Sequence, residues 1–203
     1  MSANRAYRPR RITRKAEETR ARIVAAVREM LVEGTYHEST VEEVAERAGF
    51  SRATLYQHFA SRLDLVDAIC DTLSVHPALL AIREAVGADD PEQALSGTIA
   101  NTVAFWSSEN AVFAAIYGVA EIDPGARNFV ERQRADRHGE MERLSRSLQL
   151  RKCLPQGTTQ RRAFAVLMVL TSYETYRELE RTGLSDAEIT RTLHESSRAL
   201  LLR

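Results

Sequence analysis

Apolar residues recur at intervals of three and four along almost the whole chain, and no stretch shows the sustained every-second-residue alternation of a strand. In residues 16–33, for example, Ile23, Val27 and Met30 keep the helical spacing, and Gly34 stands where such a helix should end. No Asn-Gly or Asp-Gly pair offers a hairpin turn between β-branched runs. The chain is therefore predicted to be all-α, with about nine helices and no internal repeat.

Residues that cap helices divide the chain into short and long elements. Thr40, followed three residues later by Glu43, forms a capping box before a short helix that should end at Gly49, and Ser51 can cap the next one over residues 52–59. Four helices fit within the first 75 residues. Beyond residue 77 the predicted helices are longer, and they cover residues 91–106 and 111–120, a long stretch after Pro124, and residues 158–181 and 185–200.

The formal net charge of zero conceals an asymmetry along the chain. Six basic residues precede the first acidic residue, Glu17: Arg5, Arg8, Arg10, Arg11, Arg14 and Lys15. Since the chain holds 28 basic and 28 acidic residues, the part from Glu17 onward holds 22 basic and 28 acidic ones, a net charge of −6. This charge distribution suggests that the N-terminus is a basic arm that binds a polyanion. The body of the chain, which follows the arm, is not itself polycationic. A solvated, disordered tail is the alternative.

Several classes of protein are excluded by what the sequence lacks. The longest clean apolar run, Ala163 to Leu170, has eight residues, and no apolar stretch follows the basic N-terminus, so neither a membrane span nor a secretory signal is expected. The two cysteines, Cys70 and Cys153, and the five histidines show no metal-ligand spacing, and no phosphate-binding loop or nucleophile elbow is present. We therefore expect a cytoplasmic protein that is not an enzyme and that has no metal site and no cofactor.

Residues 41–60 satisfy the geometric rule for two short helices that cross at a tight turn. The crossing needs a small residue, the turn a glycine and the second helix an apolar anchor, and Ala45, Gly49 and Leu55 fill these places at the right spacing. An ordinary corner between two helices would show the same pattern. The second helix favours a nucleic-acid reader, because its outward residues include no acid and suit base edges and phosphates in a major groove: Arg52, Ala53, Thr54, Tyr56, Gln57 and His58.

A run of residues around this turn carries a family resemblance: Ser39-Thr40-Val41, Ala45, Ala48-Gly49-Phe50-Ser51, Thr54-Leu55-Tyr56-Gln57-His58-Phe59 and Ser61-Arg62. Through these residues the chain resembles the tetracycline-repressor (TetR) family of bacterial transcriptional regulators. It departs from the family pattern at Arg62, where a lysine is usual, and at Thr35, which looks like an extra residue in the first loop. The resemblance implies a three-helix helix-turn-helix head that binds DNA and a helical body that binds a small ligand and forms dimers. The expected division is a basic N-terminal arm over residues 1–15, a helix-turn-helix DNA-binding domain over 16–62 and a ligand-binding and dimerisation domain over 63–203.

The matched positions imply how such a head would contact DNA. Arg52, Ala53 and Thr54 would read bases, with Arg52 on a guanine. The Thr40 hydroxyl would donate to a phosphate at a helix N-terminus. His58 is expected to contact a phosphate, or else to be a half-buried structural residue. The expected DNA-binding set is Arg10, Arg11, Arg14, Thr40, Ser51, Arg52, Ala53, Thr54, Tyr56, His58 and Arg62.

Aromatic residues gather in the helices that form the ligand pocket of this family, and a few polar residues accompany them. A pocket built from them would take a mostly apolar ligand. A plain aromatic core is the alternative. The expected ligand-binding set is Asn101, Phe105, Trp106, Phe113, Tyr117, Tyr173, Glu174 and Arg177.

The run from Ala163 to Leu170 is apolar around the whole helix, yet the body can bury only one of its faces within one chain. A partner helix is the simplest cover, so the last two helices are expected to form a four-helix interface with those of a second copy. Burial in the monomer core is the alternative. The expected dimerisation set is Val166, Leu167, Leu170, Leu193 and Leu200.

Together these features predict a ligand-responsive transcriptional regulator, with repression favoured over activation. It would bind an inverted-repeat operator in double-stranded DNA as a homodimer and be released by a small, mostly apolar molecule. No membrane partner is expected. The alternative is a helical small-molecule-binding protein without DNA binding. Acidic residues on the recognition face would favour that alternative, and residues 51–58 contain none.

Overall fold

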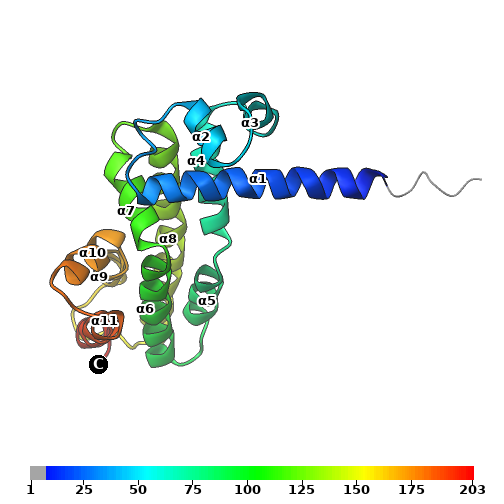
Figure 1. Ribbon diagram of the computed structural model, residues 1–203. Helices are drawn as coiled ribbons and strands as arrows, with labels where there is room; N and C mark the ends of the chain where they lie inside the picture. The colour runs from blue at the N-terminus through cyan, green and yellow to red at the C-terminus, as the bar shows by residue number, and fades with distance from the viewer. Residues whose placement is uncertain (1–7) are drawn as a thin grey trace, which may run out of the picture. The chain divides into compact units, whose positions relative to one another are not determined.

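The computed structural model describes residues 8–203, with side chains from Arg14 onward, as eleven helices without a strand (Figure 1). The helices are α1 (Arg8–Val32), α2 (Val41–Arg47), α3 (Arg52–His58), α4 (Arg62–Ser74), α5 (Pro77–Val86), α6 (Pro91–Ser108), α7 (Asn110–Val119), α8 (Pro124–Leu150), α9 (Gln160–Leu170), α10 (Tyr173–Arg181) and α11 (Asp186–Leu201). The predicted all-α class is confirmed, although about nine helices were expected. Within this described part, no single helix is long and apolar enough to cross a membrane, and α4 and α5 meet that criterion only when taken together.

The two additional helices arise from caps inside segments of helical periodicity. α5 begins after His76, whose Nδ1 accepts a hydrogen bond at 3.2 Å from the backbone N–H two residues on, and Pro77 occupies the first helical position. The segment 158–181, predicted as one helix, is two helices, because Ser172 caps α10 by accepting a hydrogen bond from the Thr175 N–H at 3.0 Å. Such a cap ends one helix and starts another while the apolar spacing continues, so periodicity alone does not show it.

α1 begins at Arg8, earlier than the predicted start at residue 16. Residues 8–15 were predicted as part of a separate arm, and the structure shows them as helix instead. Arginine and lysine have good helix propensity, so the basic run extends the helix that follows it. Residues 1–7, and the side chains of Arg10 and Arg11, lie outside the part of the chain that the structure describes.

The chain forms two compact units, which we describe separately. Unit 1 contains the residues up to Leu73 together with Ala111–Val130, and unit 2 contains Ser74–Asn110 together with Glu131–Arg203. Unit 1 is larger than the helix-turn-helix domain expected over residues 16–62, because it also includes nearly all of α4, most of α7 and the first turns of α8. α8 is one continuous helix that contributes residues to both units.

In unit 1, α1 supplies the apolar face that holds α2 and α3. Ile23 and Val27 of α1 are fully buried, as is Val44 of α2. Arg22 of α1 donates a hydrogen bond to the Ala48 carbonyl at 3.0 Å, at the C-terminal end of α2, where the helix dipole favours a cation. The two short helices are therefore fixed to the long one by apolar burial and by a charged cap.

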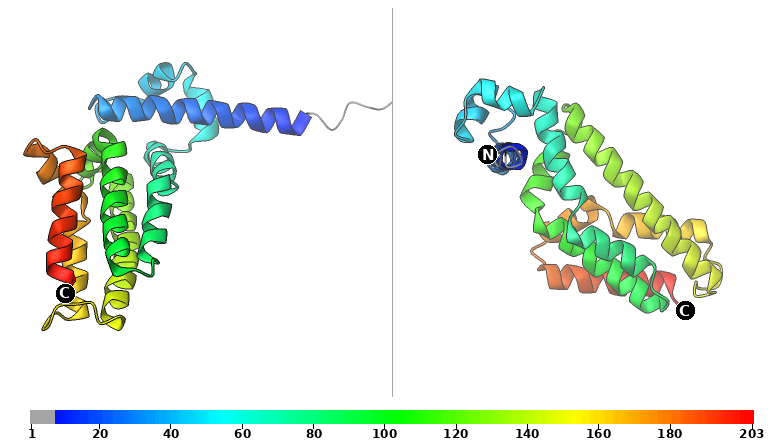
Figure 2. Two further views of the ribbon diagram at one scale, coloured as in Figure 1. Left: turned by 90° about the horizontal axis from the view of Figure 1, so that it is seen from below. Right: turned by 90° about the vertical axis from the view of Figure 1, so that its right-hand side faces the viewer.

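Unit 2 is a bundle in which α5 and α11 pack against α6, and α9 packs against α11 (Figure 2). Its buried core includes Leu95 of α6, Leu144 of α8 and Leu167 of α9. Gly97 allows α6 to approach α5 closely, because a Cβ at this position would lie 2.9 Å from the Cβ of Ala85. The bundle thus brings α5, α6, α8 and α9 around a common interior.

Candidate nucleic-acid interface and internal cavity

The turn between α2 and α3 is held by backbone and cap hydrogen bonds. Gly49 has a φ of 76°, in the left-handed region that glycine adopts without strain. The Phe50 N–H donates to the Ala45 carbonyl at 2.8 Å and closes the turn. Ser51 then caps α3 by accepting a hydrogen bond from the Thr54 N–H at 3.2 Å. The residues at these positions therefore make the tight turn that their spacing predicted.

α3 turns one face to the interior of unit 1 and the other to solvent. Leu55, and Phe59 just after the helix, are each 1% exposed and anchor α3. The opposite face carries residues predicted to contact DNA. Of these, Arg52, Ala53 and Tyr56 are exposed, and Thr54 and His58 are half-buried. Gln57, which was not in the predicted set, is exposed on the same helix. Since α3 carries no acidic side chain, this face has no charge of its own that repels phosphate.

Arg52 has an acidic partner on the neighbouring helix. Its guanidinium forms an ion pair with Glu42 of α2 and lies over the ring of Tyr56, with 5.4 Å from the guanidinium carbon to the ring centroid. The Tyr56 hydroxyl and the Glu42 carboxylate raise the pKa of Arg52 above its ordinary value. The sequence prediction considered only the charges within residues 51–58 and so missed Glu42. A base or phosphate that binds Arg52 has to share it with this carboxylate or displace it.

The hydrogen-bonding groups of Thr40 are already used within the capping box. The Thr40 N–H and hydroxyl donate to Oε2 of Glu43 at 2.6 and 2.9 Å, and the hydroxyl oxygen accepts from the Glu43 N–H at 3.2 Å. These bonds hold the pKa of Glu43 below its ordinary value. The predicted capping box is therefore confirmed. The predicted phosphate contact of Thr40 requires the hydroxyl to leave the carboxylate that now occupies this helix end.

Arg62 folds back onto the loop that follows α1. Its guanidinium donates to the Ser39 carbonyl and lies 4.1 Å from the centroid of the Tyr36 ring, and the Tyr36 hydroxyl donates to the Arg62 carbonyl at 3.1 Å. The Arg62 side chain is therefore a half-buried tie between α4 and this loop. Its Nη2 has no hydrogen-bond partner but is buried, so the phosphate contact that the sequence assigned to Arg62 requires the guanidinium to leave this site.

The buried Tyr36 predicts a loss of stability at high pH. Burial raises the pKa of Tyr36 from its ordinary 10.0 to about 12. Because the folded-state pKa is the higher one, the stabilisation is complete below pH 10.0 and is lost as the pH rises to about 12. The expected loss for this one group is about 2–3 kcal/mol in the free energy of unfolding, measured by denaturant titration across this range. Tyr36→Phe should show a shallower pH dependence, and equal slopes for the two proteins would refute the assignment.

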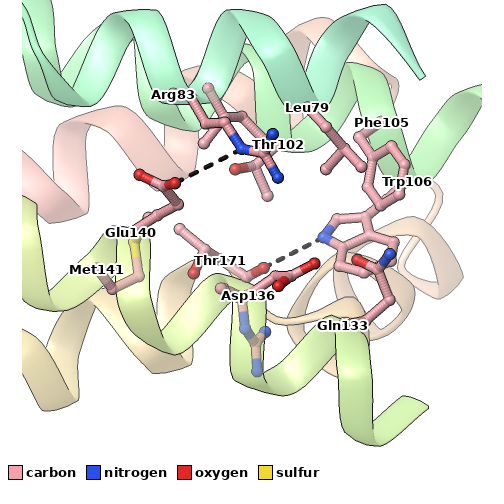
Figure 3. A pocket seen from close by; sticks show the side chains of 12 residues that line it. Leu79, Arg83, Thr102, Phe105, Trp106, Gln133, Asp136, Glu140, Met141 and Thr171 are labelled. Atoms are coloured by element: carbon pink, nitrogen blue, oxygen red, sulfur yellow. Dashed lines mark hydrogen bonds and ion pairs between the residues drawn. The ribbon is translucent and has the colours of Figure 1, made fainter. Parts of the chain in front are cut away.

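A cavity of about 50 Å³ lies inside unit 2, between α5, α6 and α8, and it is closed at one side by Thr171 (Figure 3). Its apolar wall includes Leu79, Trp106 and Met141. The Trp106 indole N–H donates to the Thr171 carbonyl at 3.2 Å, which fixes the orientation of the ring. An ion pair of 3.6 Å between Arg83 and Glu140 stands at the opposite end of the view from Trp106.

Two of the residues predicted to bind a ligand, Phe105 and Trp106, line this cavity. Phe113 and Tyr117 belong to unit 1. Tyr173 packs on the Trp106 ring at 5.2 Å between centroids, and its hydroxyl donates to the Asn110 carbonyl at 3.1 Å, so it supports the wall from outside.

The three remaining predicted ligand residues do not line the cavity either. Asn101 donates to the Gly97 carbonyl at 2.9 Å, Glu174 pairs with Arg134 at 3.3 Å, and Arg177 bonds to Asn110 and Glu180. The lining residues that the prediction missed include an uncharged polar residue on α6, Thr102, and one on α8, Gln133. Both fall on the apolar stripe of a long helix, and a polar residue on such a stripe is the signal that could have revealed them.

The residues predicted to form a dimer interface separate into two groups. Leu167 is 0% and Leu193 is 3% exposed, so both belong to the core of their own chain and their assignment to an interface is corrected. Val166 and Leu170 are half-buried, and Leu200 is 48% exposed. Val169, which the prediction did not include, is 61% exposed on α9. The apolar run on α9 is thus buried on one side and open on the other.

The α2–turn–α3 arrangement, with a buried anchor in α3 and an acid-free outer face, defines a helix-turn-helix protein. Residues 23–69 match the family described as bacterial regulatory proteins, tetR family, so the helix-turn-helix region is similar to that of the TetR family. The resemblance predicted from the residues around Gly49 is thereby confirmed.

Similar proteins support the same assignment. The HTH-type transcriptional activator FasR of Mycolicibacterium smegmatis is 42% identical over 53 residues, which are 26% of this chain and 24% of FasR. The HTH-type transcriptional regulator TtgR of Pseudomonas putida is 34% identical over 83 residues, 40% of each chain. The matched segments thus span less than half the length of these relatives. Among solved structures, native NalD of Pseudomonas aeruginosa has the same fold, with a TM-score of 0.74 at 20% identity over 93% of this chain and 98% of that of NalD.

Proposed function

We propose that this chain is a ligand-responsive transcriptional regulator, without enzymatic activity, that binds an inverted-repeat operator as a homodimer in the cytoplasm. The observation that carries the proposal is the exposed, acid-free face of α3 on a helix-turn-helix region similar to that of the TetR family. FasR is named an activator, and NalD is described as the secondary repressor of the MexAB-OprM multidrug efflux pump. Similar proteins therefore include both an activator and a repressor. We favour repression for this chain.

In the proposed complex, α3 enters the major groove with its N-terminal end toward the bases. Arg52, Ala53 and Thr54 read base edges, and the small side chains allow close approach. Tyr56 and His58 contact phosphates on either side of the groove. The proposed set of DNA contacts also includes Arg10, Arg11, Arg14 and Ser51. Thr40 and Arg62 belong to it on the condition that DNA releases them from Glu43 and from the Ser39 carbonyl.

The proposed dimer uses the open side of α9 and the end of α11. Val169 and Leu200 expose large apolar surfaces there, and Val166 and Leu170 are half-buried beside them. Covering this face with the same face of a second copy gives a two-fold interface, which matches the symmetry of an inverted repeat.

A small molecule in the cavity of unit 2 would act through α8. This helix lines the cavity with Gln133 and Met141, and its first turns belong to unit 1, where Phe129 stacks on Phe113 at 6.3 Å between ring centroids. A ligand that prefers one position of α8 therefore acts on both units of the chain and shifts the population of the DNA-binding state.

Two substitutions on α3 test the proposed orientation on DNA. Arg52→Ala should relax discrimination at one base pair by about 1–3 kcal/mol, because it removes a base contact, whereas Tyr56→Phe should weaken binding to all sequences alike. Competition binding against operators changed at single positions measures both effects. Arg47→Ala is the matched control, since it removes the same charge from α2 but its guanidinium pairs with Glu29 and Glu33 of α1. An unchanged base preference in Arg52→Ala would contradict this orientation of α3.

A further inference from the structure

Two buried polar side chains line the cavity of unit 2 without using their hydrogen-bonding capacity. Thr102 of α6 is 5% exposed and Gln133 of α8 is 7% exposed. No hydrogen bond joins the Thr102 hydroxyl or the Gln133 amide to another described group, and neither belongs to the fully buried polar atoms without a partner, so both remain accessible from the cavity. Polar atoms that face a cavity can form hydrogen bonds with a ligand placed there, so this lining is suited to a ligand that carries a hydrogen-bonding group.

The other walls of the cavity favour an aromatic ring. The rings of Phe105 and Trp106 lie 4.8 Å apart and are nearly fully buried, and the Met141 side chain is 1% exposed. Because the Trp106 N–H already donates to a carbonyl, the indole offers its apolar surface to a ligand. Ring surfaces and a thioether sulfur both pack well against an aromatic ring.

The charges around the cavity favour an uncharged ligand. Four lining side chains are ionisable, two basic and two acidic: Arg83, Arg137, Asp136 and Glu140. Glu140 pairs with Arg83 at 3.6 Å and, outside the lining, with Arg143 at 2.7 Å. The Arg83 side chain is 49% exposed, so these charges lie at the solvent-facing edge of the cavity. With the charges balanced, neither an anion nor a cation gains from the surroundings, whereas a charged group would lose its hydration.

We infer that the cavity binds a neutral, single-ring aromatic compound with a hydroxyl group, of the phenol class. The ring packs against Trp106 and Met141, and the hydroxyl exchanges hydrogen bonds with Thr102 and Gln133. The inference rests on the proposed function in one respect, because it takes this compound class as the effector of the regulator.

The size of the cavity implies that this ligand opens it. A volume of about 50 Å³ exceeds the need of a water molecule, whereas a cavity that holds benzene is on the order of 150 Å³. Met141 is unbranched and can change rotamer, and Gln133 lies on α8 directly after the segment that belongs to unit 1. Binding therefore requires an expanded cavity, and a ligand that prefers the expanded state has the differential affinity that regulation needs.

The test compares p-cresol with toluene, which has the same ring and methyl group but lacks the hydroxyl. Trp106 is the sole tryptophan of the chain and its ring borders the cavity, so its emission reports binding. We expect p-cresol to bind the full chain at least about tenfold more tightly than toluene, because only p-cresol pairs the buried polar groups.

Two nearly isosteric variants locate the hydroxyl site. Thr102→Val and Gln133→Leu should each weaken p-cresol binding about five- to tenfold and leave toluene binding unchanged or stronger. Thr98→Val is the matched control, because Thr98 is also a fully buried α6 threonine with an unpartnered hydroxyl, but it does not line the cavity. It should bind p-cresol as the parent does.

Equal affinities for p-cresol and toluene, no binding of either, or equal losses in Thr98→Val and Thr102→Val would overturn the inference. Operator binding by the same parent preparation without ligand is measured in parallel. If the parent protein binds the operator but not p-cresol, the ligand assignment is wrong and the proposed DNA-binding function stands. If operator binding is absent, the proposed function itself fails.

Discussion

Val169→Glu is expected to leave the chain folded but monomeric, and to weaken binding to an inverted-repeat operator by about 100-fold or more. Val169 is 61% exposed on α9, so within one chain a glutamate at this position meets water and costs little stability. In the proposed dimer the same position is covered by the partner, where a carboxylate without a cation is strongly unfavourable. Loss of the dimer removes the gain from binding two half-sites together.

Light scattering measures the oligomeric state, and a titration of operator DNA measures the affinity. Ile122→Glu is the matched control, since Ile122 is also an exposed apolar residue, at 79%, but lies in the loop before α8. It should remain dimeric. A Val169→Glu protein that stays dimeric would place the interface elsewhere.

Leu167→Glu tests folding and not dimerisation, because Leu167 is 0% exposed and its substitution is expected to unfold unit 2.

Leu55→Ala is expected to lower the free energy of unfolding by about 2–4 kcal/mol and to weaken DNA binding to every sequence. Leu55 is 1% exposed and anchors α3, a helix of seven residues that is too short to be stable without tertiary contacts. Gln57→Ala, on the exposed side of the same helix, should change stability by no more than about 0.5 kcal/mol. Denaturant unfolding followed by circular dichroism measures both. Equal stabilities of the two variants would show that Leu55 does not hold α3.

Features that depend on neighbours along the chain were predictable from sequence. The capping boxes of Thr40 with Glu43 and of Ser185 with Glu188 are both present, because each joins residues only three positions apart. The helix-turn-helix turn at Gly49 was predictable for the same reason. The break at Ser172 was not, because a capping serine inside an apolar run leaves the periodicity intact.

Features that depend on contacts between distant segments were predicted less well. The aromatic residues Phe113 and Tyr173 were expected at a ligand because of their type, yet packing places one in unit 1 and the other behind Trp106. The cavity instead contains Thr102 and Gln133, from helices far apart in the chain. In the same way, helical periodicity could not distinguish the buried Leu167 from the exposed Val169, since both lie in one continuous apolar run.

The central claim is that two copies of this chain read a two-fold DNA sequence through α3. Selection of bound DNA from a random pool by the full chain tests it most directly. We expect enrichment of an inverted repeat whose half-site centres lie on the order of 10 base pairs or more apart, with an affinity that falls steeply as salt is raised. A pool that stays random, or that yields a single unrepeated motif, would contradict the account.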